Sequence, residues 1–186
     1  RDRKRARGLI ETVVTAFRAP DIRRKLLFTL GILLIFRALT NVPIPNVNTQ
    51  ALTNLFTDNP LLGILNIFSG GGLAAASIIG LGVNPYINAS IIMQLMRGVI
   101  PALEELSREG EYGRNRINQY TRLLTVPLAF AQGYGISALL SANGVIPAND
   151  LFSVETMSLL LSFTAGTILL MWLGELISEK GLGNGI

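Results

Sequence analysis

The chain has 186 residues, of which 49% are hydrophobic and 15% are charged; its mean hydropathy is +0.46 and its formal net charge is +4. A soluble domain carries about 25% charged residues, so this deficit indicates a membrane protein. The sequence has no cysteine and no histidine. This excludes disulfides, thiolate or imidazole metal sites and a Ser-His-Asp triad in this chain, and we expect no cofactor and no metal.

The first segment, residues 1–25, is strongly basic and holds nine of the 16 lysines and arginines. Apolar residues recur there at helical spacing from Leu9 to Phe17, which predicts an amphipathic helix on a membrane surface that carries anionic lipid. Nucleic-acid binding is the alternative, disfavoured by the apolar segment that follows at once. The basic stretch is too long for a secretory signal peptide. Because the chain has no initiator methionine and ends at Ile186 without a polar tail, we expect a piece of a longer polypeptide.

Four membrane spans are predicted in chain order. The first ends before Pro43-Ile44-Pro45, because proline lacks an amide donor and disfavours helix in the residue before it. A polar loop follows over 46–60, and a second polar loop lies over 143–150. Together with a loop at 98–118, the pattern predicts spans at 26–42, 77–97, 119–142 and 154–176.

Basic residues in the loops predict the orientation of these spans. The N-terminal segment and the loop that ends at Arg122 are rich in arginine, whereas the loops 43–60 and 143–153 contain neither lysine nor arginine. By the positive-inside rule the first two lie in the cytoplasm and the last two outside. Four crossings return residue 186 to the cytoplasm.

Residues 61–96 form an uncharged stretch of thirty-six residues, longer than the roughly 20 that one span needs. Leu61–Phe68 is apolar but too short to cross, and Ser69-Gly70-Gly71-Gly72 predicts a hinge. A helix with several polar residues follows. Non-helical backbone at membrane depth needs protein or a water-filled cavity around it. The first part is therefore expected to enter from outside and turn back.

Two functional interpretations of the polar helix stay open on the residues alone. Its amides either make interhelical hydrogen bonds in a bundle or face a pore or cavity. Broken helices at mid-membrane suit a channel and a secondary transporter about equally, although an ion-coupled transporter usually needs intramembrane carboxylates, which this stretch lacks. An intramembrane enzyme and a scaffold without a conduit are weaker alternatives. The carboxylates of the 97–122 loop alternate with arginines, which indicates solvated ion pairs rather than a catalytic pair: Glu104, Glu105, Glu109 and Glu111.

Several runs, taken together, resemble the SecY family, the channel-forming subunit of the Sec protein translocase, in its bacterial form. The most specific is Leu81–Leu95 followed by residues 109–122. Shorter matches are Val42-Pro43-Ile44-Pro45, Phe68-Ser69-Gly70-Gly71, Met171-Trp172-Leu173-Gly174-Glu175 and Gly181-Leu182-Gly183-Asn184-Gly185-Ile186. The likeness covers nearly the whole chain from about Leu26.

The resemblance implies an all-α polytopic bundle, the N-terminal part of a ten-span, pseudo-symmetric channel. Residues 61–76 would be a re-entrant half-helix plug, with Leu65, Ile67, Phe68, Ser69, Gly70, Gly71 and Gly72 as plug and hinge. Val83 and Ile87 would belong to an apolar pore ring, which resists ions by dewetting. Asn88, Ile91 and Gln94 would belong to a lateral gate. In the cytoplasmic loop, a supporting docking role would fall to Arg108, Glu109, Arg114 and Arg116.

The family also implies a passive channel rather than an enzyme, in the plasma membrane of a prokaryote. Its partners would be SecE- and SecG-type small membrane subunits, a SecA motor or a ribosome, signal sequences, nascent polypeptides and the lipid bilayer. Nucleic acid would be met only through the ribosome. Two departures from the family pattern are Val83, where isoleucine is common, and a third glycine, Gly72, which is expected to loosen the hinge.

Overall fold

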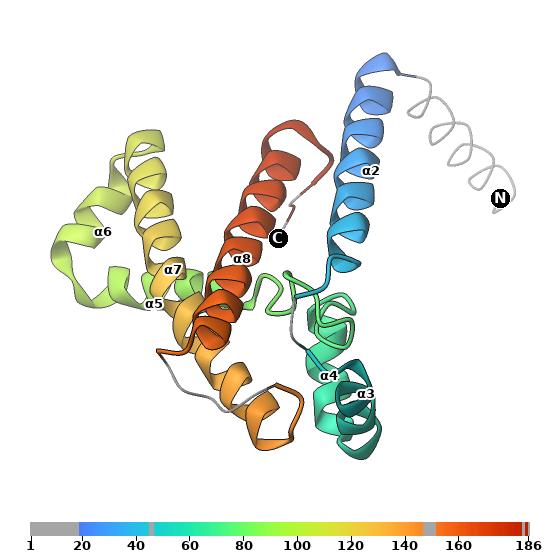
Figure 1. Cartoon of the computed structure of the whole chain (residues 1–186). Helices are drawn as coiled ribbons and strands as arrows, with labels where there is room; N and C mark the ends of the chain where they lie inside the picture. The colour runs from blue at the N-terminus through green and yellow to red at the C-terminus, as the bar shows by residue number, and fades with distance from the viewer. Residues whose placement is uncertain (1–18, 45–46, 147–151, 184, 186) are drawn as a thin grey trace, which may run out of the picture. The chain divides into compact units, whose positions relative to one another are not determined.

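A computed structural model describes residues 19–44, 47–146, 152–183 and 185 (Figure 1). Within these ranges the chain is helical and contains no strand, although an isolated antiparallel bridge joins Pro43 to Ser77. The all-α prediction is confirmed, whereas the amphipathic helix expected before residue 19 lies outside the described residues. The helices are α2 (Pro20–Thr40), α3 (Thr49–Asp58), α4 (Pro60–Phe68), α5 (Asn84–Val99), α6 (Pro101–Arg108), α7 (Glu111–Ala142) and α8 (Val154–Lys180).

The chain divides into two compact units. One contains the residues up to 37 together with residues 172–186, and the other contains residues 38–171. In the first unit, the Leu182 amide donates to Thr29 Oγ1 (3.1 Å), which itself donates to the Lys25 carbonyl (2.9 Å). The segment after α8 is thereby held against the middle of α2.

The expected polar loop over 46–60 is wrong, because α3 occupies most of it. The Asn48 side chain caps this helix by accepting from the amides of Gln50 and Ala51, both at 3.1 Å. Leu52 and Leu55 are buried, while polar side chains such as Asn54 and Thr57 point outward. More than half of the residues of this helix are polar, so the segment resembles a loop in composition although its apolar residues recur at helical spacing.

The predicted loop over 98–118 is also wrong in form. Ile100 is extended (φ −100°, ψ 111°) because Pro101 follows, and α6 leaves α5 at an angle of 102°. Gly110, at φ 70°, then starts α7, which begins before the predicted residue 119. At Gly113 a Cβ would overlap the Leu106 carbonyl, so α6 and α7 meet backbone to backbone.

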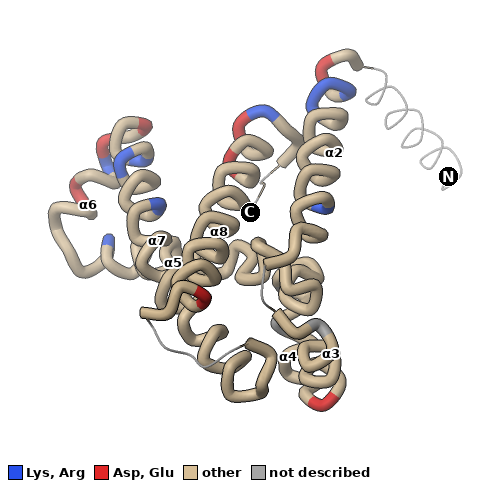
Figure 2. Tube along the Cα trace, viewed as in Figure 1, with Lys and Arg blue, Asp and Glu red and all other residues tan. Residues whose placement is uncertain are grey.

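By length and composition, α7 and α8 are each able to cross a membrane, and a third crossing is possible if the bent pair α5 and α6 forms one broken span. α2 is not among these candidate spans. Its apolar stretch follows Arg23, Arg24 and Lys25 and also contains Arg37, so the helix carries more charged residues than a membrane span usually does. Figure 2 shows that charged residues gather towards the helix ends. The four-span count stays a prediction.

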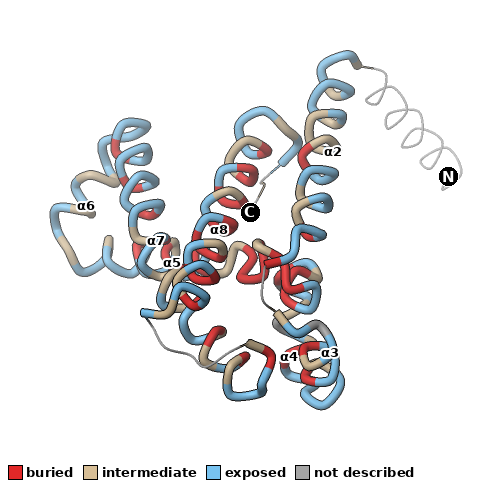
Figure 3. The backbone as a smooth tube through the Cα atoms, viewed as in Figure 1, coloured by how far each residue is buried: buried red, intermediate tan, exposed pale blue. Residues whose placement is uncertain are grey.

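The second predicted span begins later than expected, because residues 69–83 form turns rather than helix; α5 starts at Asn84. We call residues 69–83 the connecting segment. Much of it is buried, as Figure 3 shows, and Ile79 has no exposed surface. The break between helices is therefore longer than the Ser-Gly-Gly-Gly run that predicts it.

Hydroxyl side chains of the connecting segment and of α8 pair with backbone groups in and around this segment. Ser69 Oγ donates to the Asn66 carbonyl (2.9 Å) and accepts from the Leu73 amide (3.0 Å). Ser77 Oγ donates to the Leu39 carbonyl (2.8 Å). Thr167 Oγ1, from α8, donates to the Gly82 carbonyl (3.3 Å). Buried polar backbone needs such partners, so these hydroxyls allow a non-helical path here.

The connecting segment also packs closely against α8. A Cβ at Gly166 would overlap the Ile78 carbonyl, so only glycine permits this approach. Ala76 has φ 48°, a left-handed conformation that costs a residue with a Cβ roughly 1–2 kcal/mol. It is buried with Leu62 of α4 and Leu140 of α7. Tertiary packing, rather than local preference, holds this path.

We expect Ser69→Ala to loosen the connecting segment, because the buried Leu73 amide loses its acceptor. Leaving such a group unsatisfied costs about 1–3 kcal/mol. Amide hydrogen exchange of residues 69–76 in the full-length protein should quicken by roughly tenfold or more. Ser162→Ala, which removes only a bond to the Ser158 carbonyl within α8, is the matched control. Unchanged exchange in Ser69→Ala would contradict the anchoring role.

Gly166→Ala should lower the thermal stability of the full-length protein in detergent, because the added methyl group overlaps the backbone at Ile78. Overpacking of this kind typically costs about 1–3 kcal/mol. Gly98→Ala in α5 is the control, since a Cβ there meets nothing within 4 Å and alanine favours helix. Equal unfolding midpoints for the two variants would show that α8 and the connecting segment do not pack as described.

Candidate functional site

One face of α5 is apolar and is left uncovered by the other described residues. Ile87 is 39% exposed, Ile91 49% and Leu95 67%, and they recur every four residues along the helix. Val83 is half-buried one step earlier, at the N-cap. This row, Val83-Ile87-Ile91-Leu95, continues directly from the connecting segment. In a membrane protein, an apolar row of this kind contacts either lipid or an apolar surface of a partner.

The opposite face of α5 packs against α7. Its buried residues are Pro85, Ala89 and Met93, again four apart. On α7 the buried positions include small residues at the same spacing, among them Thr121, Thr125 and Ala129. Small side chains let two membrane helices approach closely. The hydroxyls of Thr121 and Thr125 donate to carbonyls one turn back at 2.9 and 2.8 Å, so their burial leaves no donor unpaired.

A polar pocket of about 400 Å³ opens where α5, α6 and α7 meet. Gln94 and Ser90 lie in it, and Gln94 Nε2 donates to Ser90 Oγ at 3.4 Å. Asn88 and Ile91 are exposed and do not line it. The three residues expected to share a gate therefore divide between two faces of α5. The complete lining is Tyr86, Ser90, Met93, Gln94, Arg97, Ser107, Arg114, Ile117, Asn118 and Thr121.

The short helix α4 exposes much of its apolar surface. Leu61 is 76% exposed, Ile64 53% and Ile67 78%, while Leu62 is buried against α3 and the end of α7. The side chains of Leu65 and Phe68 lie outside the described residues. The structure thus shows a helix with one packed side and one apolar side that nothing in the described chain covers.

The hinge glycines differ from one another. Gly70 and Gly71 adopt φ of 63° and 86°, which glycine tolerates at low cost. Gly72 is buried, and a Cβ there would lie 3.2 Å from the carbonyl oxygens of Ile79 and Ser69. The expectation that Gly72 loosens the hinge is therefore not supported: the residue permits close backbone packing.

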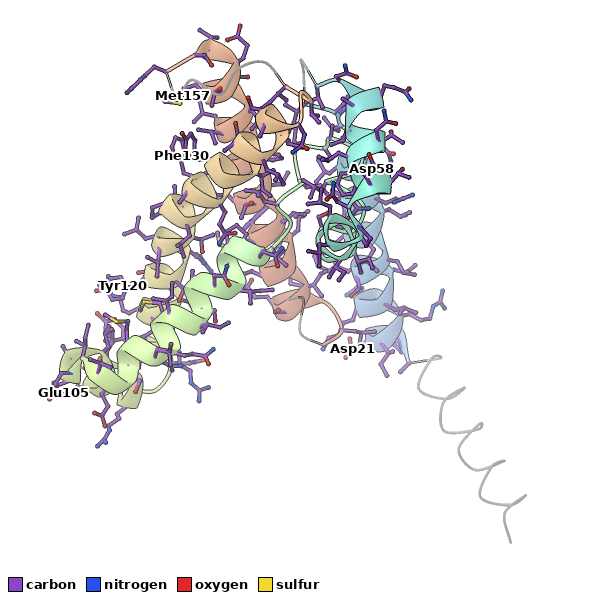
Figure 4. The ribbon with its side chains drawn as sticks, turned by 90° about the horizontal axis from the view of Figure 1, so that it is seen from below. Asp21, Asp58, Glu105, Tyr120, Phe130 and Met157 are labelled. Atoms are coloured by element: carbon purple, nitrogen blue, oxygen red, sulfur yellow. The ribbon has the colours of Figure 1, made fainter. Side chains whose placement is uncertain are left out.

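The predicted cytoplasmic-loop residues do not form one cluster. Arg108 binds Glu104 at 2.6 Å on the exposed side of α6, as an ion pair one turn apart. Arg116 Nε donates to Tyr112 Oη (3.3 Å), and its guanidinium lies 5.6 Å from that ring centre. Glu109 caps the end of α6, and Arg114 lines the polar pocket. Figure 4 shows α5 and α7 side by side, with Tyr120 directed away from α5 and Glu105 on the outer helix α6.

Sequence reasoning missed the residues that hold the site in place. Asn66 Oδ1 accepts from the Ala74 amide (2.9 Å), and Ser77 and Thr167 bind distant carbonyls. Arg97, in the last turn of α5, is a further residue of this kind. The available signal was the presence of small polar residues in otherwise apolar stretches; their partners lie far along the chain.

The chain resembles known proteins over most of the segments described above. The SecY family model matches residues 77–186, which include the connecting segment from Ser77 onward, α5, α7 and α8. The chain is 45% identical to the protein translocase subunit SecY of Streptomyces scabiei, aligned over 96% of this chain and 44% of that protein. It is 42% identical to the same subunit of Synechocystis sp., over 98% of this chain and 41% of the other. The chain therefore spans less than half the length of these relatives.

Two solved structures share the fold at low identity. One is described as Sec61 in the canine ribosome-channel complex from the endoplasmic reticulum, with TM-score 0.60, 20% identity, and coverage of 88% of this chain and 34% of that chain. The other is a SecY protein whose plug domain stabilises the closed state of its translocation channel, with the same score and identity and coverage of 89% and 34%. With the family model matched over more than half of its length, this chain belongs to the SecY family.

Proposed function

We propose that the full-length protein is the central subunit of a protein translocation channel. It would pass unfolded secretory polypeptides across the membrane and release membrane-protein segments laterally into lipid. The names of its relatives, protein translocase subunit SecY, support this role. The observation that carries it is the apolar row of α5, uncovered in this chain, placed directly after a buried connecting segment that is not helical.

The proposal assigns Val83 and Ile87 to an apolar constriction. A ring of such side chains resists ions because water leaves a narrow apolar passage easily, yet it binds no particular peptide sequence. The exposed fraction of Ile87 leaves it available to a partner surface or a moving chain. Ile91, one turn further along the same row, and Asn88 would lie along the lateral exit, while Gln94 faces the polar pocket behind it.

The proposal assigns the plug to α4 and the hinge to the start of the connecting segment. The exposed side of α4, with Ile64 and Ile67, would cover the external entrance of the channel. Ser69 and Asn66 fix the hinge by three hydrogen bonds, so the plug would move about a defined point. Opening would then break contacts of α4 and leave α5 in place.

For the whole assembly we propose a multi-pass protein of a prokaryotic plasma membrane, with its N-terminus and residue 186 in the cytoplasm. Its bacterial relatives and the clustering of basic residues in two loops support this orientation. Small SecE- and SecG-type subunits, and a SecA motor or a ribosome, are proposed partners. The solved Sec61 ribosome-channel complex supports the ribosome. The channel itself would be passive, with the partner supplying energy.

Ile87→Asn in the full-length protein should make the resting membrane leaky to small ions, because an amide keeps water in the constriction. Conductance of reconstituted proteoliposomes without motor or ribosome is the measurement, and we expect a clear rise over the wild type. Ile87→Leu, which keeps an apolar side chain, and Ile92→Asn, on another side of the same helix, are the controls. If the conductance of Ile87→Asn equals that of the wild type, the assignment of Ile87 to the constriction is wrong. Loss of a solute-uptake activity instead would favour a secondary transporter.

A further inference from the structure

The guanidinium of Arg97 is the most unusual polar group in the described chain. Its Nε is buried and has no hydrogen-bond partner. A buried polar atom without a partner costs about 1–3 kcal/mol, and more when it carries charge. A bound ion or water is one of the explanations for such a group in a native protein.

The surroundings of Arg97 select for an anion. It lies in the last turn of α5 and lines the polar pocket with Arg114 of α7. Among the described residues that line the pocket, none is acidic. Glu104, a carboxylate of the adjoining helix α6, already binds Arg108 on the exposed side. Two cations therefore share one pocket without a protein counter-charge in its lining.

The remaining lining suits an oxyanion with several acceptors. Ser90, Gln94 and Asn118 add hydroxyl and amide groups to the two guanidinium groups. A phosphate group accepts many hydrogen bonds at once, and arginine binds it through two parallel N–H groups. The pocket volume of about 400 Å³ lies in the range of organic ligand sites.

We propose that this pocket, between α5, α6 and α7, binds a phosphate group through the guanidinium groups of Arg97 and Arg114. The group is either the headgroup of an anionic phospholipid or a free phosphate ion. The site is independent of the proposed channel: it uses the side of α5 that faces α7, and neither Val83 nor Ile87 lines it.

The test uses purified full-length protein stripped of lipid in a non-ionic detergent. The unfolding midpoint is titrated with inorganic phosphate, with soluble dihexanoyl phosphatidylglycerol and, as the chain-length control, with dihexanoylglycerol. We expect a phosphate-bearing probe to raise the midpoint and dihexanoylglycerol to leave it unchanged. A rise with phosphatidylglycerol alone identifies a lipid headgroup site, and a rise with both phosphate probes identifies a site for the free ion.

Variants locate the binding. Arg97→Gln and Arg114→Gln should each weaken the apparent affinity by roughly tenfold to a hundredfold, the usual effect of losing a charge-assisted hydrogen bond. Arg108→Gln, whose partner is Glu104, should retain wild-type affinity. If Arg97→Gln does not fold, Arg97→Lys keeps the charge but not the paired donors and should still weaken binding. The proposal is overturned if neither phosphate probe raises the unfolding midpoint. It is also overturned if Arg114→Gln and the folded Arg97 variant both bind the probe with the apparent affinity of the wild type.

Discussion

The need to satisfy backbone groups away from water governs this structure. Residues 69–83 leave helical geometry in an uncharged stretch, and each unpaired amide or carbonyl at membrane depth would cost several kcal/mol. Ser69, within the segment, accepts from the Leu73 amide, and Thr167 of α8 donates to the Gly82 carbonyl. Backbone bonds to residues 42 and 44 satisfy the Ile78 amide and the Ala76 carbonyl. Because these partners exist, a short helix, a turn-rich passage and a long helix can follow one another where an ordinary protein would have a single span.

The paired helices α5 and α7 form the support on which the proposed channel surface rests. Small buried residues on both helices bring their backbones close, and the apolar row of α5 points away from the contact. A surface that contacts many different peptide segments needs a fixed backbone beneath it. The contact with α7 keeps the side chains of the apolar row at constant spacing while a peptide moves past them. The polar pocket interrupts the pair at the end beside α6, and a smaller cavity of about 250 Å³, lined by Asn84, Gln132 and Gly135 among others, lies at the other end.

The sequence predicted the membrane class, the helical fold and the break after Phe68, since charge clustering, apolar length and glycine runs are local signals. It did not predict α3, because the cap at Asn48 and the buried Leu52 are masked by polar neighbours. The start of α5 was placed too early because the bonds that hold residues 69–83 come from Leu39 and Thr167, which no local pattern connects. The separation of Asn88 and Gln94 around α5 follows from helical spacing, but which of them lines the pocket depends on how α5 packs against α7.

The corner between α5 and α7 has a practical consequence for experiments on this protein. Pro101 sets the turn, and the Leu106 carbonyl packs directly against Gly113. The stretch that the sequence predicts as a loop is therefore a helix packed against α7. A fluorophore or epitope inserted there would disturb the packing of α6 against α7, and its signal would not describe the motion of a free loop. Labels meant to follow motion are better carried by the exposed outer side of α6, at positions such as Glu105.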